Sequence, residues 1–586
     1  MVTAAMVSET DSLLAKPRNR FSWRALGAAG ALGAAGLVVA SVGGPSLSPS
    51  PARRATLLRT EAEASALAIE YQTCAATGVG AEVRCVIDPA ALLNFASVAA
   101  HSELSGVNDE DMLEKYLPSV IEVRYDPSLL DAEEFDQARV TFNLYLPDNG
   151  DGAKQIDNTL ASYLIVAKLD GTPLSVVVTT DLDDGPRSTH FGALKLTAPD
   201  TIIGMSNTWC SENGTAYVWK WKEGAEGIFA LNAAVRGSSH DISVSYKAPA
   251  GDDGVPAAYW LPGTAKMTDL DEHDAATGAV LRSFPATQSG YMNHAQIFEK
   301  DTRALISYRM ANTVTMFDME TGEELWSAGG TGGTLDLINL DGSRIPAGTN
   351  SIWYGQHNAE YFGDESVYLF DNAYEREMPS RLIKVRVDVE AKTATVEWAH
   401  VIFDSYPHGY SDVFGDADRL PSGNVLATWF TGALYPEKGL DFDAQIVQIT
   451  PDHETAWSMA FKNTQYVLGG APCVAEGDAG CKRSIKTGWK MYSAEMFYEG
   501  PRVKNAAVAD ATLMFSAAAA FKRKEASDAT WTLAADEAVL ATGAFSFPAY
   551  HRSVDAEFAL PAAPPAGVPL TLTVSDEFGS TTTVAI

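Results

Sequence analysis

The chain has 586 residues, 46% of them hydrophobic, so it is longer than one ordinary domain and can bury a substantial core. Its formal net charge of −32 disfavours nucleic acid as a partner, because phosphate binding needs clustered Lys and Arg. Acidity that is spread along the chain is typical of solubility or of a saline or lumenal setting.

The N-terminal region contains an uncharged segment, 25–44, that is long enough to span a bilayer. Basic residues precede it, and the positive-inside rule places residues 1–24 in the cytosol. A cleaved signal peptide, cut near 41–44, is the alternative. The sequence predicts an uncleaved signal-anchor helix. The protein would then be a single-pass membrane protein of the secretory and endomembrane system, with most of the chain lumenal or extracellular.

Cysteines are few, and they suggest local disulfides in an oxidising lumen. No CxxC motif or zinc-like Cys/His spacing occurs, so the sequence predicts neither a metal site nor a cofactor. Asn213 begins an Asn-Gly-Thr glycosylation sequon, and Cys210 has no obvious partner. The two candidate disulfides are Cys74 with Cys85 and Cys473 with Cys481.

Residues 45–118 are predicted to form a linker and a helical segment, with helical composition at 61–71 and 88–104. Strand signals dominate from about residue 119, where alternating and β-branched runs begin. Residues 163–180 predict two strands around an Asp-Gly turn.

A repeating unit occupies the middle of the chain. Each unit begins with a His, continues with strands separated by turns, and in three cases ends at a Trp: Trp326, Trp398 and Trp457. Short-stranded repeats of about 40–50 residues are typical of propeller blades, whose equivalent positions converge on a central channel. Residues 119–500 therefore predict a β-propeller, in which the tryptophans pack between blades. The recurring histidines are His190, His240, His294, His357 and His408.

From residue 501 onward the strands continue without histidine lead-ins, and residues 501–586 predict a small immunoglobulin-like β-sandwich. The expected fold class is thus all-β: a propeller, a C-terminal sandwich and an N-terminal transmembrane helix.

The histidine lead-ins are also candidates for chemistry. Neutral imidazole is a competent nucleophile near neutral pH, and a guanidinium suits a tetrahedral oxyanion such as sulfate. His357 and Arg376 begin and follow two neighbouring strands, so both can face the channel. For any one His, the alternative is a turn residue that bonds a backbone carbonyl. That structural role suits His190 and His240 best, because the strands after them are less regular.

Three segments resemble the arylsulfate sulfotransferase family of arylsulfotransferase-like propellers. These segments are NHAQIFEKDTRALISYRMANTVTMFDMETGEELWSAGG, QHNAEYFGDESVYLFDNAYEREMPSRLIKVRVD and DRLPSGNVLATW. The third carries Ser422 where the family usually has Asn. The resemblance spans roughly 155–500 and is specific over 290–460.

The resemblance implies a six-bladed propeller. It also implies sulfuryl transfer from a phenolic sulfate ester to a phenol through a sulfohistidine, without the donor phosphoadenosine phosphosulfate. Carried over by position, His408 is the nucleophile, while His294, His357 and Arg376 bind the sulfuryl oxygens. The loop 400–410 is shorter here than in the bacterial enzymes of the family, which leaves His408 the least secure assignment. Four tyrosines flank these residues and either stack on the aryl ring or pack on blade surfaces: Tyr291, Tyr354, Tyr406 and Tyr410.

Two other functions remain open from the sequence. The propeller and sandwich would also suit a non-catalytic module that binds sulfated glycans or a protein partner, or a structural propeller. The sequence names neither the donor nor the acceptor, and it leaves the oligomeric state unknown.

Overall fold

The structure is a computed structural model, which describes most of the chain beyond residue 119. Residues 1–71, which contain the predicted membrane segment, lie outside it, as do 88–104. The described residues are 72–76, 82–87, 118, 120–147, 159–179, 190–207, 214–231, 240–247, 254–262, 269–286, 291–402, 410–411, 413–430, 442–462, 489–536, 538–565 and 567–586.

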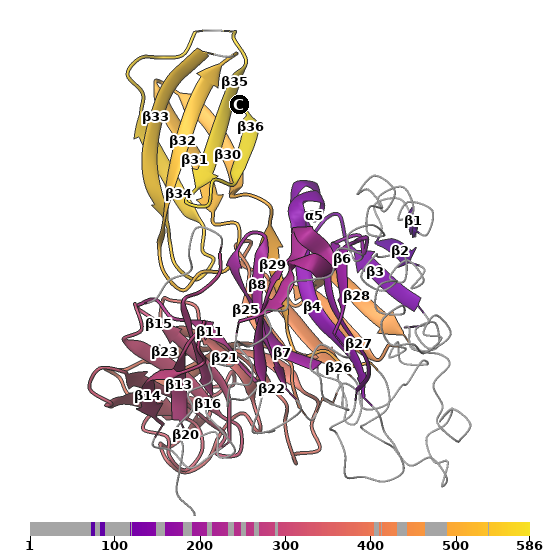
Figure 1. Ribbon diagram of the computed structural model, residues 1–586. Helices are drawn as coiled ribbons and strands as arrows, with labels where there is room; N and C mark the ends of the chain where they lie inside the picture. The colour runs from indigo at the N-terminus through magenta and orange to yellow at the C-terminus, as the bar shows by residue number, and fades with distance from the viewer. Residues whose placement is uncertain are drawn as a thin grey trace, which may run out of the picture. The chain divides into compact units, whose positions relative to one another are not determined.

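The described chain is dominated by β-strands, which confirms the predicted all-β class (Figure 1). Its described helices are short: α5 (Ala132–Gln137) and the 3₁₀ helix η2 (Trp221–Gly227). Six of the described sheets, all outside the C-terminal part of the chain, each contain an antiparallel run of four strands. The C-terminal part contributes two more sheets, of three and four strands.

Three of the six sheets are built from consecutive strands, as the repeating sequence unit predicts. Their strands are β7 (His190–Ala198), β8 (Thr201–Asn207), β9 (Thr215–Lys220) and β10 (Ile228–Ala230); β11 (Ser243–Val244), β12 (Ala258–Pro262), β13 (Asp269–Asp274) and β14 (Val280–Pro285); and β15 (Met292–Phe298), β16 (Arg303–Tyr308), β17 (Thr313–Asp318) and β18 (Glu324–Ala328).

The fourth sheet is larger, because two short strands, β19 (Asp336–Ile338) and β20 (Arg344–Ile345), extend it. Its four-stranded run consists of β21 (His357–Tyr361), β22 (Ser366–Asp371), β23 (Arg381–Asp388) and β24 (Thr393–Val401).

The last two sheets combine strands from distant parts of the chain. The first orders β25 (Asp416–Arg419), β26 (Val425–Phe430), β27 (Ala444–Ile449) and β28 (Thr455–Lys462), followed by β3 (Val120–Tyr125), β2 (Val83–Ile87) and β1 (Gln72–Ala76). The second orders β29 (Ala494–Tyr498), β4 (Ala138–Pro147), β5 (Thr159–Lys168) and β6 (Pro173–Val178). The predicted closing strand near residue 490 is β29.

The β5–β6 turn shows how local chemistry fixes a strand pair. Gly171 has φ +89°, and a Cβ there would lie 1.9 Å from Cδ1 of Ile87. The Asp170 carboxylate accepts the Thr172 backbone N–H at 2.9 Å. A glycine is therefore needed both for the backbone conformation and for the close approach. The predicted Asp-Gly turn is confirmed.

Hydrophobic cores join the six sheets in a closed series, which we call the sheet ring. Each core contains residues from two or more successive sheets, and the last sheet shares a core with the first. In order around the ring, the residues that share a core include Leu164 with Phe191, Ile203 with Tyr259, Trp260 with Ile297, Leu305 with Leu369 and Val447, and Val123 with Val140.

Strands β7, β11, β15, β21, β25 and β29 each begin the four-stranded run of one sheet, and we call them the leading strands. Leading strands of neighbouring sheets contact one another, as in β15 with β21 and β29 with β7. They therefore face the interior of the sheet ring, where the six sheets converge.

The C-terminal strands, yellow in Figure 1, form two antiparallel sheets over one hydrophobic core that includes Phe515, Trp531 and Leu572. One sheet contains β30 (Arg502–Ala509), β31 (Thr512–Ala518) and β34 (Val554–Ala559). The other contains β32 (Ser527–Ala535), β33 (Ala538–Phe547), β35 (Leu570–Asp576) and β36 (Thr581–Ala585).

The predicted membrane localisation needs correction. Within the described ranges, no helix is both long and apolar enough to cross a bilayer. This finding overturns the prediction of a single-pass membrane protein. The segment 25–44, on which that prediction rested, lies outside the described residues. The segment consists mostly of Ala and Gly, and a lack of charge is a weaker membrane signal than strongly apolar side chains.

Candidate functional site

The recurring histidines occupy equivalent places in the sheet ring. His190 and His357 begin β7 and β21, His294 is the third residue of β15, and His240 precedes β11. Tyr492 holds this place before β29 in the sheet without a histidine. The periodicity thus marks the entrance of each leading strand.

β-Bulges interrupt several leading strands close to their histidines. Register shifts separate Met292 from His294 in β15 and His357 from Glu360 in β21. Asn358, directly after His357, has φ +45°, a left-handed conformation that asparagine tolerates better than most residues. Bulges re-aim side chains and are frequent beside active sites, so this end of the sheet ring is built to orient polar groups.

His357 is almost completely buried, and its tautomer is fixed by its neighbours. Nδ1 lies 2.7 Å from Asn372 Oδ1 and 3.1 Å from the Gly355 carbonyl oxygen. The Asn372 amide donates to the carbonyl oxygens of Ser411 and Phe414, each at 2.9 Å, which fixes its orientation. Both partners of Nδ1 are acceptors, so Nδ1 carries the proton and Nε2 carries the lone pair.

The charge state of His357 suits a nucleophile. Burial lowers its pKa well below the ordinary 6.5, and the nearby charge of Arg309 lowers that pKa further. Its imidazole is therefore neutral at physiological pH. A neutral imidazole with its proton tied on one nitrogen presents the other nitrogen as base or nucleophile.

Aromatic rings form the surroundings of His357. The rings of Tyr492 and Phe414 each lie 6.3 Å from the His357 ring and 4.9 Å from one another. On its other side the Tyr492 ring lies 5.8 Å from that of His240, which in turn lies 5.3 Å from Tyr291. This arrangement links the entrances of several leading strands and could accommodate an aryl group.

The structure places a different guanidinium near His357 from the one the sequence suggested. Arg309, just after β16, acts on the His357 pKa, and its guanidinium lies 4.5 Å from the ring centroid of Tyr374. Arg376 is instead exposed and stacks on the Tyr354 ring at 3.6 Å. The sequence analysis quoted the segment that contains Arg309 but overlooked this residue, which lies in the turn after β16.

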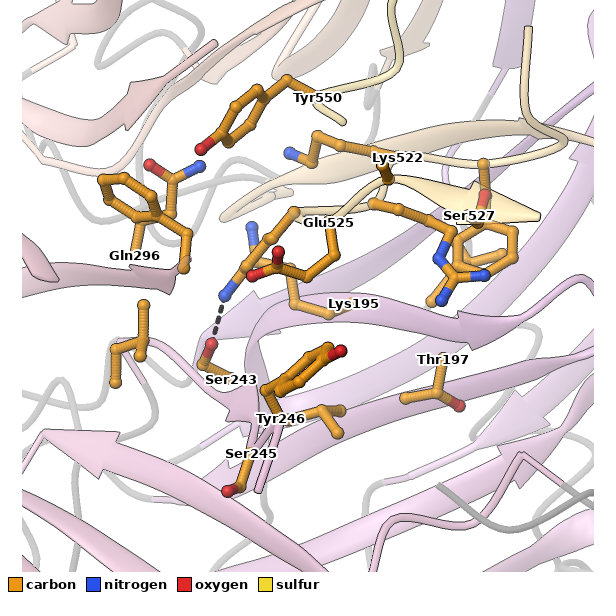
Figure 2. A pocket seen from close by; sticks show the side chains of 18 of the residues that line it. Lys195, Thr197, Ser243, Ser245, Tyr246, Gln296, Lys522, Glu525, Ser527 and Tyr550 are labelled. Carbon is orange, nitrogen blue, oxygen red and sulfur yellow. Dashed lines mark hydrogen bonds between the residues drawn. The ribbon is translucent and has the colours of Figure 1, made fainter. Parts of the chain in front are cut away.

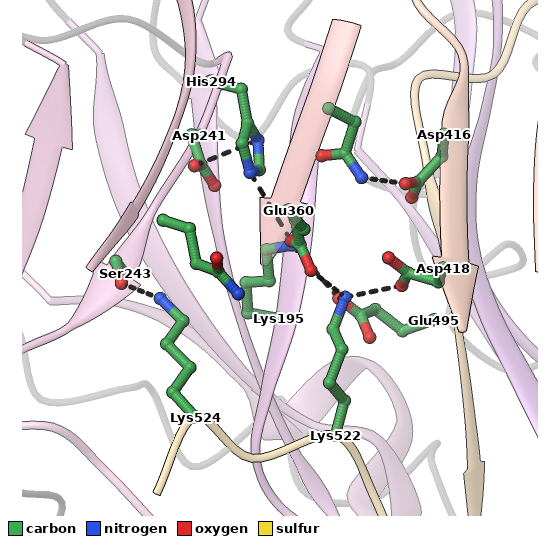
Figure 3. A network of polar contacts seen from close by, with 12 residues as sticks. Lys195, Asp241, Ser243, His294, Glu360, Asp416, Asp418, Glu495, Lys522 and Lys524 are labelled. Atoms are coloured by element: carbon green, nitrogen blue, oxygen red, sulfur yellow. Dashed lines mark hydrogen bonds and ion pairs between the residues drawn. The ribbon is translucent and has the colours of Figure 1, made fainter. Parts of the chain in front are cut away.

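His294 lies in a separate, strongly charged environment (Figure 3). Its Nδ1 is 3.2 Å from Asp241 Oδ2, and its Nε2 is 3.6 Å from Glu360 Oε1. Burial lowers the His294 pKa to about 4 despite these carboxylates. The groups that act on the His294 pKa differ from those that act on the His357 pKa, so the two histidines occupy different polar surroundings.

A buried ion network continues from His294 toward the C-terminal sheets (Figure 3). Lys195 of β7 lies 2.6 Å from Glu360 and 3.3 Å from Glu495. Lys522, in the loop between β31 and β32, lies 2.8 Å from Glu360, 2.5 Å from Asp418 and 3.3 Å from Glu495. A loop of the C-terminal part thus supplies a cation to carboxylates of three leading strands.

The carboxyl groups of the network have pKa values that are shifted in different directions. Burial alone would raise the pKa of Glu360, but the two lysines outweigh it and hold that pKa well below the ordinary range. Burial raises the pKa of Asp418 to about 7. Asp416 accepts a hydrogen bond from the Asn358 amide, and burial raises its pKa as well. The sequence analysis missed this network, although charged residues inside four of the leading strands, β7, β21, β25 and β29, signal it.

Several predicted site residues lie outside the described residues: His408, Tyr406, Asn213, Cys210, Cys473 and Cys481. Cys85 is disulfide-bonded and faces Cys74 across the β1–β2 pair. Tyr410 is partly buried. Within the ranges that the structure describes, no group of three or more His, Cys, Asp or Glu could hold a metal ion.

Comparison with protein families gives one match. Residues 290–466 match the family described as Arylsulfotransferase (ASST). The matched segment contains His294, Arg309, His357 and Arg376 and runs from just before β15 to just beyond β28. The resemblance predicted from the sequence motifs is confirmed for this segment. A comparison with curated proteins gives no match.

Solved structures give only distant likenesses. A dihydro-heme d1 dehydrogenase is 10% identical with a TM-score of 0.28, and the chains overlap over 52% of this protein and 53% of the dehydrogenase. A 6-phosphogluconolactonase of Bacteroides fragilis, described as putative, is 10% identical over 55% of this chain and 96% of its own, with a TM-score of 0.30. A periplasmic gluconolactonase of Pseudomonas aeruginosa is 9% identical over 59% and 93%, with a TM-score of 0.32. At these values the likenesses carry no functional conclusion.

Proposed function

We propose that this protein moves a sulfuryl group from a phenolic sulfate ester to a phenolic acceptor. The proposal rests on the match of residues 290–466 to the arylsulfotransferase (ASST) family. The reaction proceeds through a sulfohistidine and uses no phosphoadenosine phosphosulfate. The observation that carries this proposal is His357, a buried neutral imidazole whose Nδ1 proton is tied to Asn372. We interpret the sheet ring as a six-bladed propeller and the C-terminal sheets as an immunoglobulin-like sandwich.

The first half-reaction forms the covalent intermediate. An imidazole nitrogen attacks the sulfur of the donor, an N–S bond forms, and the S–O bond to the aryl group breaks. The phenolate leaves with the bonding electron pair. The sulfohistidine then carries the SO₃ group and retains its Nδ1 proton.

The second half-reaction restores the enzyme. The acceptor phenol attacks the sulfur, its O–S bond forms, and the N–S bond breaks with its electrons returning to the imidazole. The proton of the acceptor hydroxyl neutralises the phenolate released in the first half. Atoms and charges therefore balance over the two halves, without an added cofactor.

Two histidines are candidates for the nucleophile. The sequence motif assigns the role to His408, which lies outside the described residues. The described geometry supports His357, whose Nε2 carries the lone pair.

We assign the stabilisation of developing charge to Arg309. The positive charge of its guanidinium lowers the His357 pKa. A cation held beside the reacting sulfur stabilises the charge that develops on its oxygens. His294 suits this role less well, because Asp241 and Glu360 would repel an anion there.

Turnover of 4-nitrophenyl sulfate with phenol as acceptor tests the proposal on the full chain. Continued release of 4-nitrophenolate, beyond the first turnover, should require phenol, and His357→Ala and His408→Ala should each lower the rate by at least about 100-fold. Mass spectrometry of enzyme quenched without acceptor should find the sulfohistidine on one of them. His453→Ala, in the exposed β27–β28 turn, is the control and should keep full activity.

The same experiment decides the alternative from the sequence, a non-catalytic module for sulfated glycans or a protein partner. Saturable binding of 4-nitrophenyl sulfate without any nitrophenolate release would support that module and refute the transferase. Equal rates in the wild type and both histidine variants would refute the histidine mechanism while leaving transfer itself in place.

A further inference from the structure

A cavity of about 770 Å³ lies between the leading strands and the loop that joins β31 to β32 (Figure 2). The sheet ring contributes residues late in the leading strands, such as Lys195 of β7 and Gln296 of β15. The histidines mark the beginnings of the same strands, and none of the predicted site residues lines the cavity. The cavity is thus distinct from the His357 site, and its volume is typical of a small-molecule pocket.

The walls of the cavity are rich in aromatic rings, several of them from the C-terminal part of the chain. Hydroxyl and amide groups lie between these rings, including those of Ser243, Ser245 and Gln296 (Figure 2). An apolar wall with a few converging polar groups is the usual composition of a ligand site. The aromatic residues of the lining are Tyr246, Phe298, Phe362, Phe521, Tyr550 and Phe578.

The buried carboxylates of the lining are already neutralised. Glu360 and Glu495 share Lys195 and Lys522, as described above. Asp301 accepts hydrogen bonds from the backbone N–H groups of Tyr246 and Lys247 and pairs with Arg282 at 3.2 Å.

The carboxylates nearer the rim have partners too. Glu577 pairs with Arg523, and Glu525 accepts the Lys300 backbone N–H at 2.6 Å. Asp528 is exposed at the rim and accepts a hydrogen bond from the Ser546 hydroxyl at 3.4 Å. The buried carboxylates of the lining are therefore balanced by cations, whereas Glu525 and Asp528 at the rim are held only by neutral donors.

Lys524 is the exception among the cations of the lining. Its ammonium donates a hydrogen bond to the Ser243 hydroxyl, and no carboxylate of the described residues lies within ion-pair distance of it (Figure 3). Burial lowers its pKa to about 8, against the opposing fields of Asp241 and Glu360, while Lys195 and Lys522 lower it further. A desolvated ammonium with one neutral partner gains most from a bound anion.

We propose that this cavity binds an aromatic organic anion, with Lys524 as the counter-ion and the aromatic walls around the ring of the ligand. The ligand class is an aryl group that carries a carboxylate, sulfate or sulfonate. The Ser243 hydroxyl, which accepts from Lys524, and the second amide N–H of Gln296 supply further hydrogen bonds to the anion. This site does not depend on sulfuryl transfer at the histidines.

Calorimetric titration of the full chain with 2-naphthalenesulfonate tests the site, with 2-naphthalenemethanol as the uncharged probe. Lys524→Met should weaken sulfonate binding by about tenfold or more and leave the alcohol unchanged, because charge-assisted hydrogen bonds are the strong ones. Lys524→Arg should stay within about threefold of the wild type. Lys392→Met, in the exposed β23–β24 turn, is the matched control and should not differ from the wild type.

The pH dependence and a second variant separate this site from the histidine site. Wild-type affinity for the sulfonate should fall as pH rises from 7 to 9, since Lys524 loses its proton near pH 8. The affinity of Lys524→Met should stay flat over that range. Arg309→Met should leave the pH-sensitive, Lys524-dependent part of the titration unchanged. Loss of sulfonate binding in Arg309→Met but not in Lys524→Met, or no saturable binding in the wild type, would overturn the proposal.

Discussion

Asn372 accepts the Nδ1 proton of His357 at 2.7 Å, and together with the Gly355 carbonyl at 3.1 Å it decides which imidazole nitrogen can react. The amide cannot be reversed, because two backbone carbonyls hold its nitrogen. A neutral amide oxygen orients the ring without adding the negative charge that a carboxylate would bring. The ring is therefore oriented but keeps the low pKa that its burial imposes.

Replacement of Asn372 should separate the effect of the His357 ring orientation on activity from the effect of a nearby charge on the His357 pKa. Asn372→Ala should lower kcat by about 10–100-fold with little change in KM, because only the longer contact to the Gly355 carbonyl then holds the Nδ1 proton and orients the ring. Asn372→Asp should place a carboxylate beside Nδ1 and raise the His357 pKa, so that activity is lost at a higher pH than in the wild type. The pH profile of kcat/KM for 4-nitrophenyl sulfate measures both effects. Identical profiles in the wild type and Asn372→Asp would show that Asn372 is merely structural.

The wild-type pH profile is itself a prediction. The neutral form of His357 is the reactive one, and burial and Arg309 hold its pKa well below 6.5. Activity should therefore be flat as pH falls from 7 to 5.5, where an ordinary histidine would become protonated. Arg309→Met should move the acid limb upward, because the charge that lowers the pKa is removed. An acid limb centred near 6.5 in the wild type would contradict the assignment of His357.

Sequence reasoning located the site along the strands but not its composition. The histidine spacing correctly predicted that His190, His240, His294 and His357 occupy equivalent strand entrances, because a repeating unit places its residues at repeating positions. Tyr492 escaped notice, since the sixth unit replaces the histidine with a phenol. A pattern defined by recurring histidines does not include a tyrosine at the equivalent position.

The ion network was harder to predict for a different reason. Lys522 lies more than 100 residues from Glu360 and Asp418, in a segment that the sequence assigned to a separate domain. A local signal existed in Glu495, which is a charged residue inside an otherwise apolar strand. Such a residue predicts a buried partner, but only the fold identifies that partner.

Removal of Lys522 should destabilise the protein strongly. Lys522→Met would leave Glu360, Asp418 and Glu495 with less counter-charge in a buried site, which costs about 3–5 kcal/mol. Lys504→Met is the matched control, because Lys504 makes a half-exposed ion pair with Asp131 whose loss costs about 0–1 kcal/mol. Urea unfolding midpoints of both variants measure the difference. Equal shifts in the two variants would mean that Lys522 does not neutralise the buried carboxylates.

The raised pKa of Asp443 predicts the direction in which the free energy of unfolding changes with pH. Burial raises that pKa from 3.8 to about 7, and the main compensating contact is the Trp489 backbone N–H, 3.2 Å from Oδ2. Between pH 4 and 7 the folded state therefore holds a proton that the unfolded state has lost. The contribution of Asp443 to stability is fully present below pH 3.8 and is lost as pH rises through 7.

Asp443→Asn should abolish this loss, because the amide does not titrate. The free energy of unfolding of the variant relative to the wild type should rise by about 1.4 kcal/mol per pH unit between pH 4.5 and 6.5 and level off above pH 8. Any fixed effect of the new amide shifts this difference equally at every pH and leaves its slope unchanged. Urea denaturation at several pH values measures the slope. A difference independent of pH would show that Asp443 is ionised in the folded protein throughout this range.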